Sequence, residues 1–150
     1  MIKKDEDLTC EIGACYLKYL RKCLSQLHDQ EKELTELCNK IKIANAIHLY
    51  GFGRSGAAAM SLAIRLRHFC NYLNPVWWVG DQVRMPIRSG DLVILFSQSG
   101  NRKEVVLISK EAAKAGAEIA VITSSKNSII RSKATVTIFL PKLNKKIVYG

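Results

Sequence analysis

The spacing of apolar residues divides the chain near residue 43. From residue 8 to residue 43 there is no proline and a single glycine, Gly13, and apolar side chains recur in steps of three and four. This spacing predicts one long amphipathic helix, interrupted on its apolar face by Glu31. Such a stripe needs a partner surface, which is either the body of the domain or another subunit. The stripe consists of Leu17, Leu20, Leu24, Leu27, Leu34, Cys38 and Ile41.

After residue 43, short apolar runs alternate with segments of helical spacing. Apolar strands separated by helices are typical of a parallel sheet covered on both faces. The sequence therefore predicts an α/β fold, in which a five-stranded parallel sheet is flanked by helices. Residues 1–43 form the N-terminal helix and residues 44–150 the ligand-binding domain, together one folded unit. Strands are expected at 46–50, 76–79, 92–96, 119–123 and 135–140, helices at 55–70 and 102–115, and helical turns at 128–133.

Positive charge is concentrated in the second part of the chain. The sequence has 150 residues, of which 48% are hydrophobic and 24% charged, and its net charge is +10. Residues 1–43 carry eight basic and eight acidic residues, whereas residues 44–150 carry fifteen basic and five acidic ones. This excess favours an anionic ligand such as a phosphate ester or a nucleotide.

The composition also argues against several partners. No apolar run reaches the roughly 18–20 residues of a membrane helix, and the N-terminus lacks the apolar core of a signal peptide. The protein is therefore expected to be cytoplasmic, with no membrane partner. The five cysteines include no C-x-x-C pair and no histidine at metal-ligand spacing, so no metal is expected. The basic residues are not arranged as a nucleic-acid reading helix, so no nucleic-acid partner is expected.

Two loops each follow a predicted strand and open a predicted helix. Residues 51–56 read GFGRSG, whose glycines allow a tight turn and bring backbone N–H groups close to a ligand. Residues 97–102 read SQSGNR and offer hydroxyls and positive charge around a phosphate-sized space. The hydroxyl-rich residues 123–128 are expected to cap the short helix that follows. A distant alternative for G-x-G-x-x-G is a dinucleotide site, with Asp81 binding the ribose.

These motifs, in this order, resemble the sugar isomerase (SIS) domain family, and within it the 6-phospho-3-hexuloisomerases. The likeness extends from about residue 8 to residue 141 and includes RLRH at 65–68 and VGDQ at 79–82. It implies a flavodoxin-like three-layer sandwich that interconverts arabino-hex-3-ulose 6-phosphate and fructose 6-phosphate, a step of the ribulose monophosphate pathway. It also implies a phosphorylated sugar as ligand, no metal or organic cofactor, and a homo-oligomer, a dimer or tetramer, formed through the N-terminal helix.

The resemblance further implies which residues bind the substrate. Ser97, Ser99 and the backbone of residues 100–102 hold the phosphate, and Ser55 contacts the sugar end. The sequence departs from the family pattern in three ways: residues 101–102 replace a Glu-Thr pair, Asp81 replaces a glutamate, and the family's catalytic glutamate is expected to have no counterpart in residues 142–150. The complete predicted binding set is Gly53, Arg54, Ser55, Ser97, Gln98, Ser99, Gly100, Asn101 and Arg102.

Moving a carbonyl between C3 and C2 passes through a cis-enediol and requires a base that removes a proton. His68 and Asp81 are the predicted catalytic residues, and Glu104 is a third candidate for the base. Two hypotheses remain open. The protein is either a phosphosugar isomerase, with a base supplied by a neighbouring subunit, or a non-catalytic domain that senses or sequesters a phosphosugar.

Overall fold

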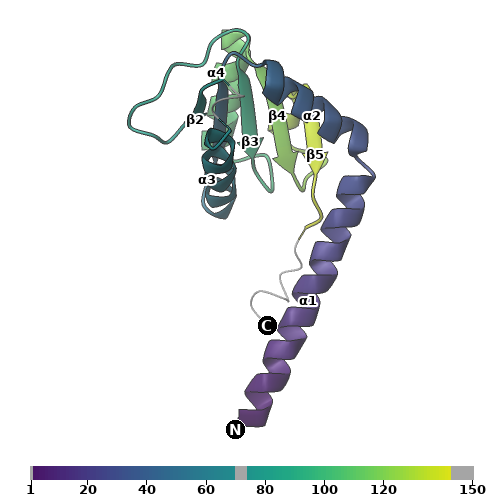
Figure 1. Ribbon diagram of the computed structural model, residues 1–150. Coiled ribbons are helices and arrows are strands. Elements are labelled where there is room, and N and C mark those ends of the chain that lie inside the picture. Colours follow the sequence, from purple (N-terminus) through teal and green to yellow (C-terminus); the bar gives the residue numbers. More distant parts are fainter. Residues whose placement is uncertain (1, 70–73, 143–150) are drawn as a thin grey trace.

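A computed structural model, which describes residues 2–69 and 74–142, contains a parallel sheet of five strands (Figure 1). The strands are β1 (Ile47–Gly51), β2 (Val76–Trp78), β3 (Leu92–Phe96), β4 (Glu118–Thr123) and β5 (Val136–Phe139). Their order in the sheet is β2-β1-β3-β4-β5, and each neighbouring pair is parallel. The predicted α/β fold with a five-stranded parallel sheet is confirmed.

Helices cover both faces of this sheet and make three layers. α2 (Glu31–Ile43) and α3 (Arg54–Arg67) pack on one face, and α4 (Lys103–Ala115) and the 3-10 helix η1 (Ile129–Lys133) pack on the other. The first helix of the chain is α1 (Ile2–His28). Within the described residues, each helix is too short or too polar to cross a lipid bilayer.

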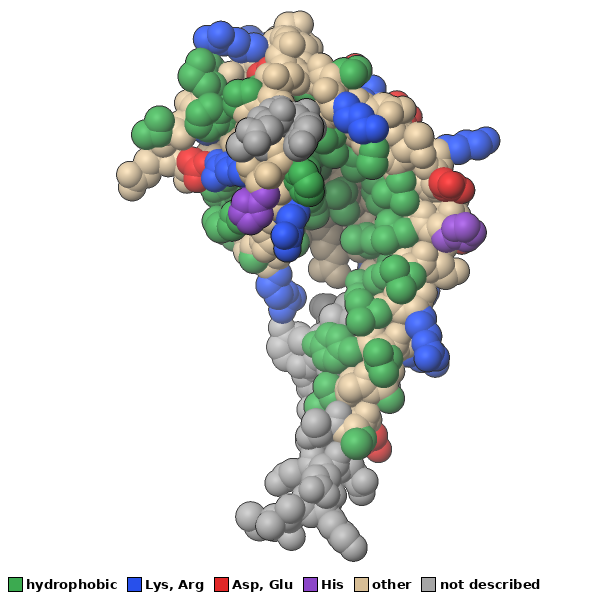
Figure 2. All heavy atoms as spheres, viewed as in Figure 1, with side chains coloured by type: hydrophobic (Ala, Val, Ile, Leu, Met, Phe, Trp, Pro, Cys, Tyr) green, Lys and Arg blue, Asp and Glu red, His purple; other side chains and the backbone are tan. Residues whose placement is uncertain are grey.

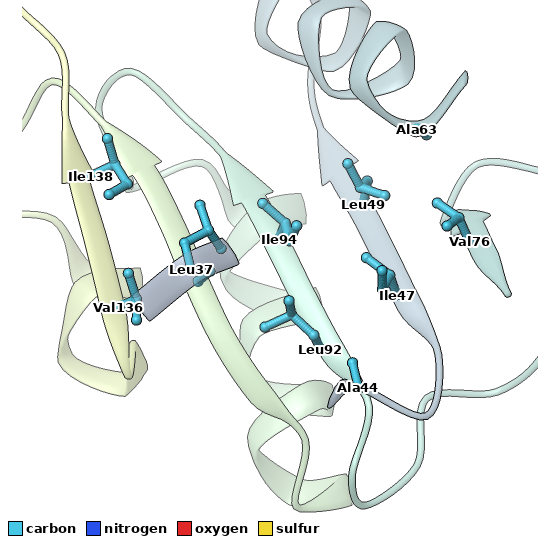
Figure 3. Packing of buried hydrophobic residues seen from close by; sticks show 11 residues of the cluster. Leu37, Ala44, Ile47, Leu49, Ala63, Val76, Leu92, Ile94, Val136 and Ile138 are labelled. Carbon is cyan, nitrogen blue, oxygen red and sulfur yellow. The ribbon is translucent and has the colours of Figure 1, made fainter. Parts of the chain in front are cut away.

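The core consists of two clusters of buried side chains, one on each face of the sheet. Figure 3 shows the first face, where Leu37 of α2 lies against side chains from the strands. Along β3, Leu92 and Ile94 belong to this cluster, whereas Val93 and Leu95 belong to the cluster under α4. All four are at most 1% exposed. Burial on both sides explains why this strand is an unbroken apolar run rather than an alternating one.

A buried histidine interrupts the apolar core at β1. His48 is fully buried, and its Nε2 lies 3.0 Å from Oδ2 of Asp91. The same carboxylate oxygen accepts the backbone N–H of Arg88 at 2.8 Å. Desolvation lowers the pKa of His48 and outweighs the opposing effect of the Asp91 hydrogen bond. The fold therefore favours the neutral imidazole.

The prediction of a single helix over residues 8–43 is wrong in one respect. The helix is interrupted at residues 29–30, which separate α1 from α2. At this break the Gln30 side chain reaches the edge strand β5. Its Nε2 donates to the Phe139 carbonyl at 2.9 Å, and its Oε1 accepts the Phe139 N–H at 2.7 Å. Glu31, the interruption in the apolar stripe, is the first residue of α2. After the break, Leu37 is buried and Cys38, a predicted stripe member, is exposed.

The two halves of the apolar stripe have different surroundings. Leu27 and Leu34 pack against the core beside the sheet. By contrast, Leu17, Leu20 and Leu24 of α1 are 59%, 53% and 67% exposed. α1 extends away from the sheet (Figure 1), and Figure 2 shows hydrophobic side chains along it.

The parallel register brings three strand ends to one edge of the sheet. Gly51 at the end of β1 lies opposite Phe96 of β3, and Phe96 lies opposite Ile122 of β4. The loops that follow these strands therefore leave from the same edge. In open parallel sheets this carboxyl edge is where ligands bind.

Candidate functional site

The glycine-rich turn after β1 is too tight for side chains at two of its positions. A Cβ atom on Gly51 would lie 2.7 Å from the Ser55 carbonyl oxygen, and one on Gly56 would lie 2.8 Å from the Gly51 carbonyl oxygen. Gly53 precedes α3 with a φ of +57°, which side chains disfavour. The turn therefore directs the N-terminal N–H groups of α3 toward the carboxyl edge of the sheet.

Hydroxyl groups order the serine-rich loop after β3 from within. Ser97 is buried, and its Oγ accepts the N–H of Gly100 at 3.0 Å. The Oγ of Ser99 accepts the N–H of Asn101 at 3.3 Å. Helix α4 has no side-chain hydrogen bond at its N-cap, so these hydroxyls shape the loop rather than cap the helix.

The turn before η1 fixes the serine-rich loop from outside. The Gly100 carbonyl accepts the N–H of Ile130 at 3.3 Å, and Oδ1 of Asn101 accepts the N–H of Ile129 at 2.9 Å. Gly100 has a φ of +68°, and a Cβ atom there would lie 2.0 Å from the Cβ of Ser128. The loop conformation thus depends on contacts with residues about 28 positions away in the chain.

The two loops enclose a small cavity of about 230 Å³. Arg102 at the start of α4 crosses to the glycine-rich turn, where its Cζ lies 4.2 Å from the centroid of the Phe52 ring. The described lining residues include two arginines and no carboxylate. Of the predicted binding set, this cavity is lined by Gly53, Arg54, Ser55, Ser97, Gln98, Ser99 and Arg102.

A large cavity of about 710 Å³ adjoins the small one, since Arg54, Ser55, Ser97 and Gln98 line both. Its further lining comes from elements that the sequence did not associate with a ligand. The side chains on α1 and after β4 that complete this wall are Tyr16, Tyr19, Thr123 and Ser124.

The loop at 123–128 does not cap the helix that follows, contrary to the expectation. Ser128 is at the N-cap of η1 but makes no side-chain hydrogen bond there. Instead, the Oγ1 of Thr123 donates to the Gln98 carbonyl at 3.2 Å, and the Ser124 N–H approaches the same oxygen at 3.2 Å. Thr123 and Ser124 therefore support the serine-rich loop from β4 and line the large cavity.

Tyr19 joins α1 to the segment after β5. Its hydroxyl donates to the Pro141 carbonyl at 3.0 Å, and both residues line the large cavity. Burial, with a smaller contribution from the side chain of Cys23, raises the pKa of Tyr19 to about 12. Tyr19 therefore remains a neutral hydrogen-bond donor at physiological pH.

Neither of the two predicted catalytic residues lines a cavity within one chain. His68 is exposed at the C-cap of α3, about 20 Å along this 14-residue helix from the glycine-rich turn. The Oδ2 of Asp81 is paired with Nη2 of Arg67 at 2.6 Å and accepts the Trp78 N–H at 3.3 Å. Glu104 is exposed in the first turn of α4.

The remaining predicted binding residues have supporting positions. Gly100 and Asn101 line neither cavity, and their contacts hold the serine-rich loop against η1. No sequence motif marks Tyr16 or Tyr19 as cavity residues, because their position in the cavity depends on how α1 is placed relative to the sheet. Among the described residues, no three His, Cys, Asp or Glu side chains form a group that could share a metal ion.

Comparison with known protein families shows which family the chain belongs to. The SIS domain profile matches residues 40–149. The chain belongs to the SIS domain family. This SIS domain is 30% identical over 131 residues to a protein of Bacillus subtilis (strain 168) named 3-hexulose-6-phosphate isomerase, a match that covers 83% of the chain and 68% of the relative. A protein of the same name from Mycobacterium gastri is 31% identical, with coverage of 76% and 56%.

Solved structures agree with this assignment. A crystal structure from Methanococcus jannaschii, of a protein with an inferred function of 3-hexulose-6-phosphate isomerase, matches with a TM-score of 0.72 and 25% identity, over 96% of this chain and 77% of the other. The Vibrio vulnificus NanR protein complexed with ManNAc-6P shares the fold, with a TM-score of 0.72 and 19% identity over 88% of this chain and 51% of the other. The SIS domain spans 56% to 68% of the two curated relatives described above.

Proposed function

We propose that this SIS domain binds a phosphosugar and interconverts arabino-hex-3-ulose 6-phosphate and fructose 6-phosphate. The phosphate occupies the small cavity, and the sugar extends into the large one. The observation that carries the proposal is the meeting of the glycine-rich and serine-rich loops around one space. The 3-hexulose-6-phosphate isomerases among the relatives support this choice of substrate.

The chemistry of the small cavity suits a phosphate dianion. Two guanidinium groups, the serine hydroxyls and the N-terminus of α3 are directed to one region, while the described lining has no carboxylate to repel an anion. Guanidinium groups and helix N-termini both favour negative charge. The basic excess of residues 44–150 acts in the same direction over a longer range.

The isomerisation needs a base, and among the residues that the structure describes no His, Asp or Glu side chain lines either cavity. His68 follows directly after α3, whose outer face exposes Met60 (43%) and Ile64 (49%). An apolar face of this kind is suited to contact another subunit. In an oligomer that uses this face, His68 of one subunit removes the proton at C2 of arabino-hex-3-ulose 6-phosphate bound by its neighbour, which gives a cis-enediolate. A proton is then returned to C3 and the hydroxyl proton moves from O2 to O3, which yields fructose 6-phosphate.

The position of the candidate bases also favours a second function. Because His68, Asp81 and Glu104 lie outside both cavities, the same geometry supports a domain that binds a phosphosugar without turnover. The dinucleotide alternative has less support, since the carboxylate expected to bind a ribose is paired with Arg67.

One experiment separates these functions. The protein is incubated with fructose 6-phosphate, and formation of the 3-ketose is followed by NMR, while a thermal shift reports binding. Turnover supports the isomerase, and a thermal shift without turnover supports the binding domain. Ser99→Ala should abolish the shift because Ser99 lines the small cavity, whereas Ser61→Ala, which removes an exposed hydroxyl on α3, should leave it unchanged. No shift with the wild-type protein would refute both functions.

We also propose that α1 forms a homo-oligomer with other copies of this chain. Its exposed leucines continue the apolar stripe beyond the part that the core covers. The double variant Leu20→Glu/Leu24→Glu should reduce the mass measured by light scattering after size-exclusion chromatography. Leu107→Glu, at a 56% exposed leucine on α4, is the matched control and should not change the mass. A wild-type monomer would contradict the proposal.

A further inference from the structure

The two loops of the site are joined by a contact between Phe52 and Arg102. The Arg102 guanidinium carbon lies 4.2 Å from the centroid of the Phe52 ring, well within the range of a cation–π interaction. Both residues line the small cavity. Phe52 is 46% exposed at the tip of a tight turn, so burial in the core does not account for an aromatic side chain at this position.

Stacking and anion binding use different parts of a guanidinium group. The aromatic ring attracts the flat face, whereas the N–H groups lie in the plane and point outward from its edge. An arginine stacked on a ring can therefore still donate hydrogen bonds to phosphate oxygens. Stacking also restricts a long side chain that is otherwise free to adopt many rotamers, which lowers the entropy lost when a ligand binds.

We infer that Phe52 is a positioning residue that holds the guanidinium of Arg102 at the small cavity, where it binds the substrate phosphate. This inference rests on the proposed phosphosugar function and adds a division of roles to it. Arg102 contacts the ligand, and Phe52 acts through Arg102. The contact also fixes the distance between the two loops, because each residue belongs to a different one.

The test is a double-mutant cycle on the dissociation constant of fructose 6-phosphate, measured by calorimetry. Arg102→Ala should weaken binding at least about tenfold, because a charge-assisted hydrogen bond is lost. Phe52→Leu should weaken binding about threefold, and Phe52→Tyr should retain it because the ring is kept. In the Arg102→Ala background, Phe52→Leu should have no further effect.

Each outcome of this cycle is informative. Equal weakening by Phe52→Leu in both backgrounds would overturn the inference while leaving the proposed function intact, since Phe52 would then act independently of Arg102. Unchanged affinity in Phe52→Leu would overturn it in the same way. A wild-type protein that does not bind fructose 6-phosphate would refute the proposed function itself. Unfolding temperatures without ligand should stay equal among the variants, which distinguishes a binding effect from a loss of fold.

Discussion

The replacement of Gly100 by alanine tests whether the serine-rich loop is held as the structure indicates. Gly100 has a φ of +68°, and an added Cβ would lie 2.0 Å from the Cβ of Ser128 and 2.6 Å from its Oγ. The loop cannot easily move away, because the Gly100 carbonyl accepts the Ile130 N–H on one side and the Gly100 N–H donates to Ser97 on the other. The substitution therefore combines backbone strain with a steric clash.

The two costs can be estimated separately. A left-handed conformation costs a residue with a side chain roughly 1–2 kcal/mol, and overpacking costs about 1–3 kcal/mol. Gly100→Ala should therefore destabilise the protein by about 2–5 kcal/mol. For a domain of about this size, each kcal/mol lowers the unfolding temperature by about 2–4 °C, so a central value of about 3 kcal/mol corresponds to about 6–12 °C.

Thermal unfolding followed by circular dichroism measures this effect, with Gly116→Ala as the matched control. Gly116, the C-cap of α4, is left-handed with a φ of +75° and a ψ of 22°, and a Cβ there would come no closer than 3.4 Å to Ser89, so the control carries the backbone strain alone. Ser128→Gly introduced into Gly100→Ala should recover the steric part of the loss, because it removes the clashing Cβ. If Gly100→Ala and Gly116→Ala unfold at the same temperature, the proposed packing of the loop on Ser128 is incorrect.

Three further predictions follow from contacts elsewhere. Burial lowers the folded-state pKa of His48 below its usual value of about 6.5, so the unfolded chain becomes protonated at this residue before the folded protein does. The free energy of unfolding measured in urea should therefore fall as the pH decreases from 7.5 to 5.5. The variant His48→Gln should lose less of this free energy over the same interval. Gln30→Ala should lower the free energy of unfolding by about 1–3 kcal/mol in urea titrations, since it leaves the Phe139 backbone groups unpaired. Asp81→Asn should lower the free energy of unfolding by at most about 1 kcal/mol, because the Asp81–Arg67 pair is partly exposed. It should leave the thermal shift with fructose 6-phosphate unchanged. Loss of that shift would show that the carboxylate contributes to binding.

Elements with a local cause could be predicted from the amino-acid sequence without knowledge of the fold. The strand at 92–96 was predicted with its observed bounds. A short, unbroken apolar run is typical of a strand whose two faces are both buried. The glycine-rich turn and the serine-rich loop were also recognisable. Glycine permits tight turns, and serine hydroxyls form hydrogen bonds with backbone groups only a few residues away. Parallel strand order then implied that both loops lie at one edge, which the register confirms.

Features that depend on residues far apart in the chain became apparent only in the folded structure. The break at Gln30 follows from hydrogen bonds to Phe139, 109 positions later, and a helical spacing carries no information about that contact. The contribution of Tyr16 and Tyr19 to the large cavity depends on the direction in which α1 extends from the sheet. The placement of His68 outside both cavities depends on the direction of α3. Local sequence specifies which backbone shapes are accessible, whereas the docking of helices and loops on the sheet determines which side chains meet.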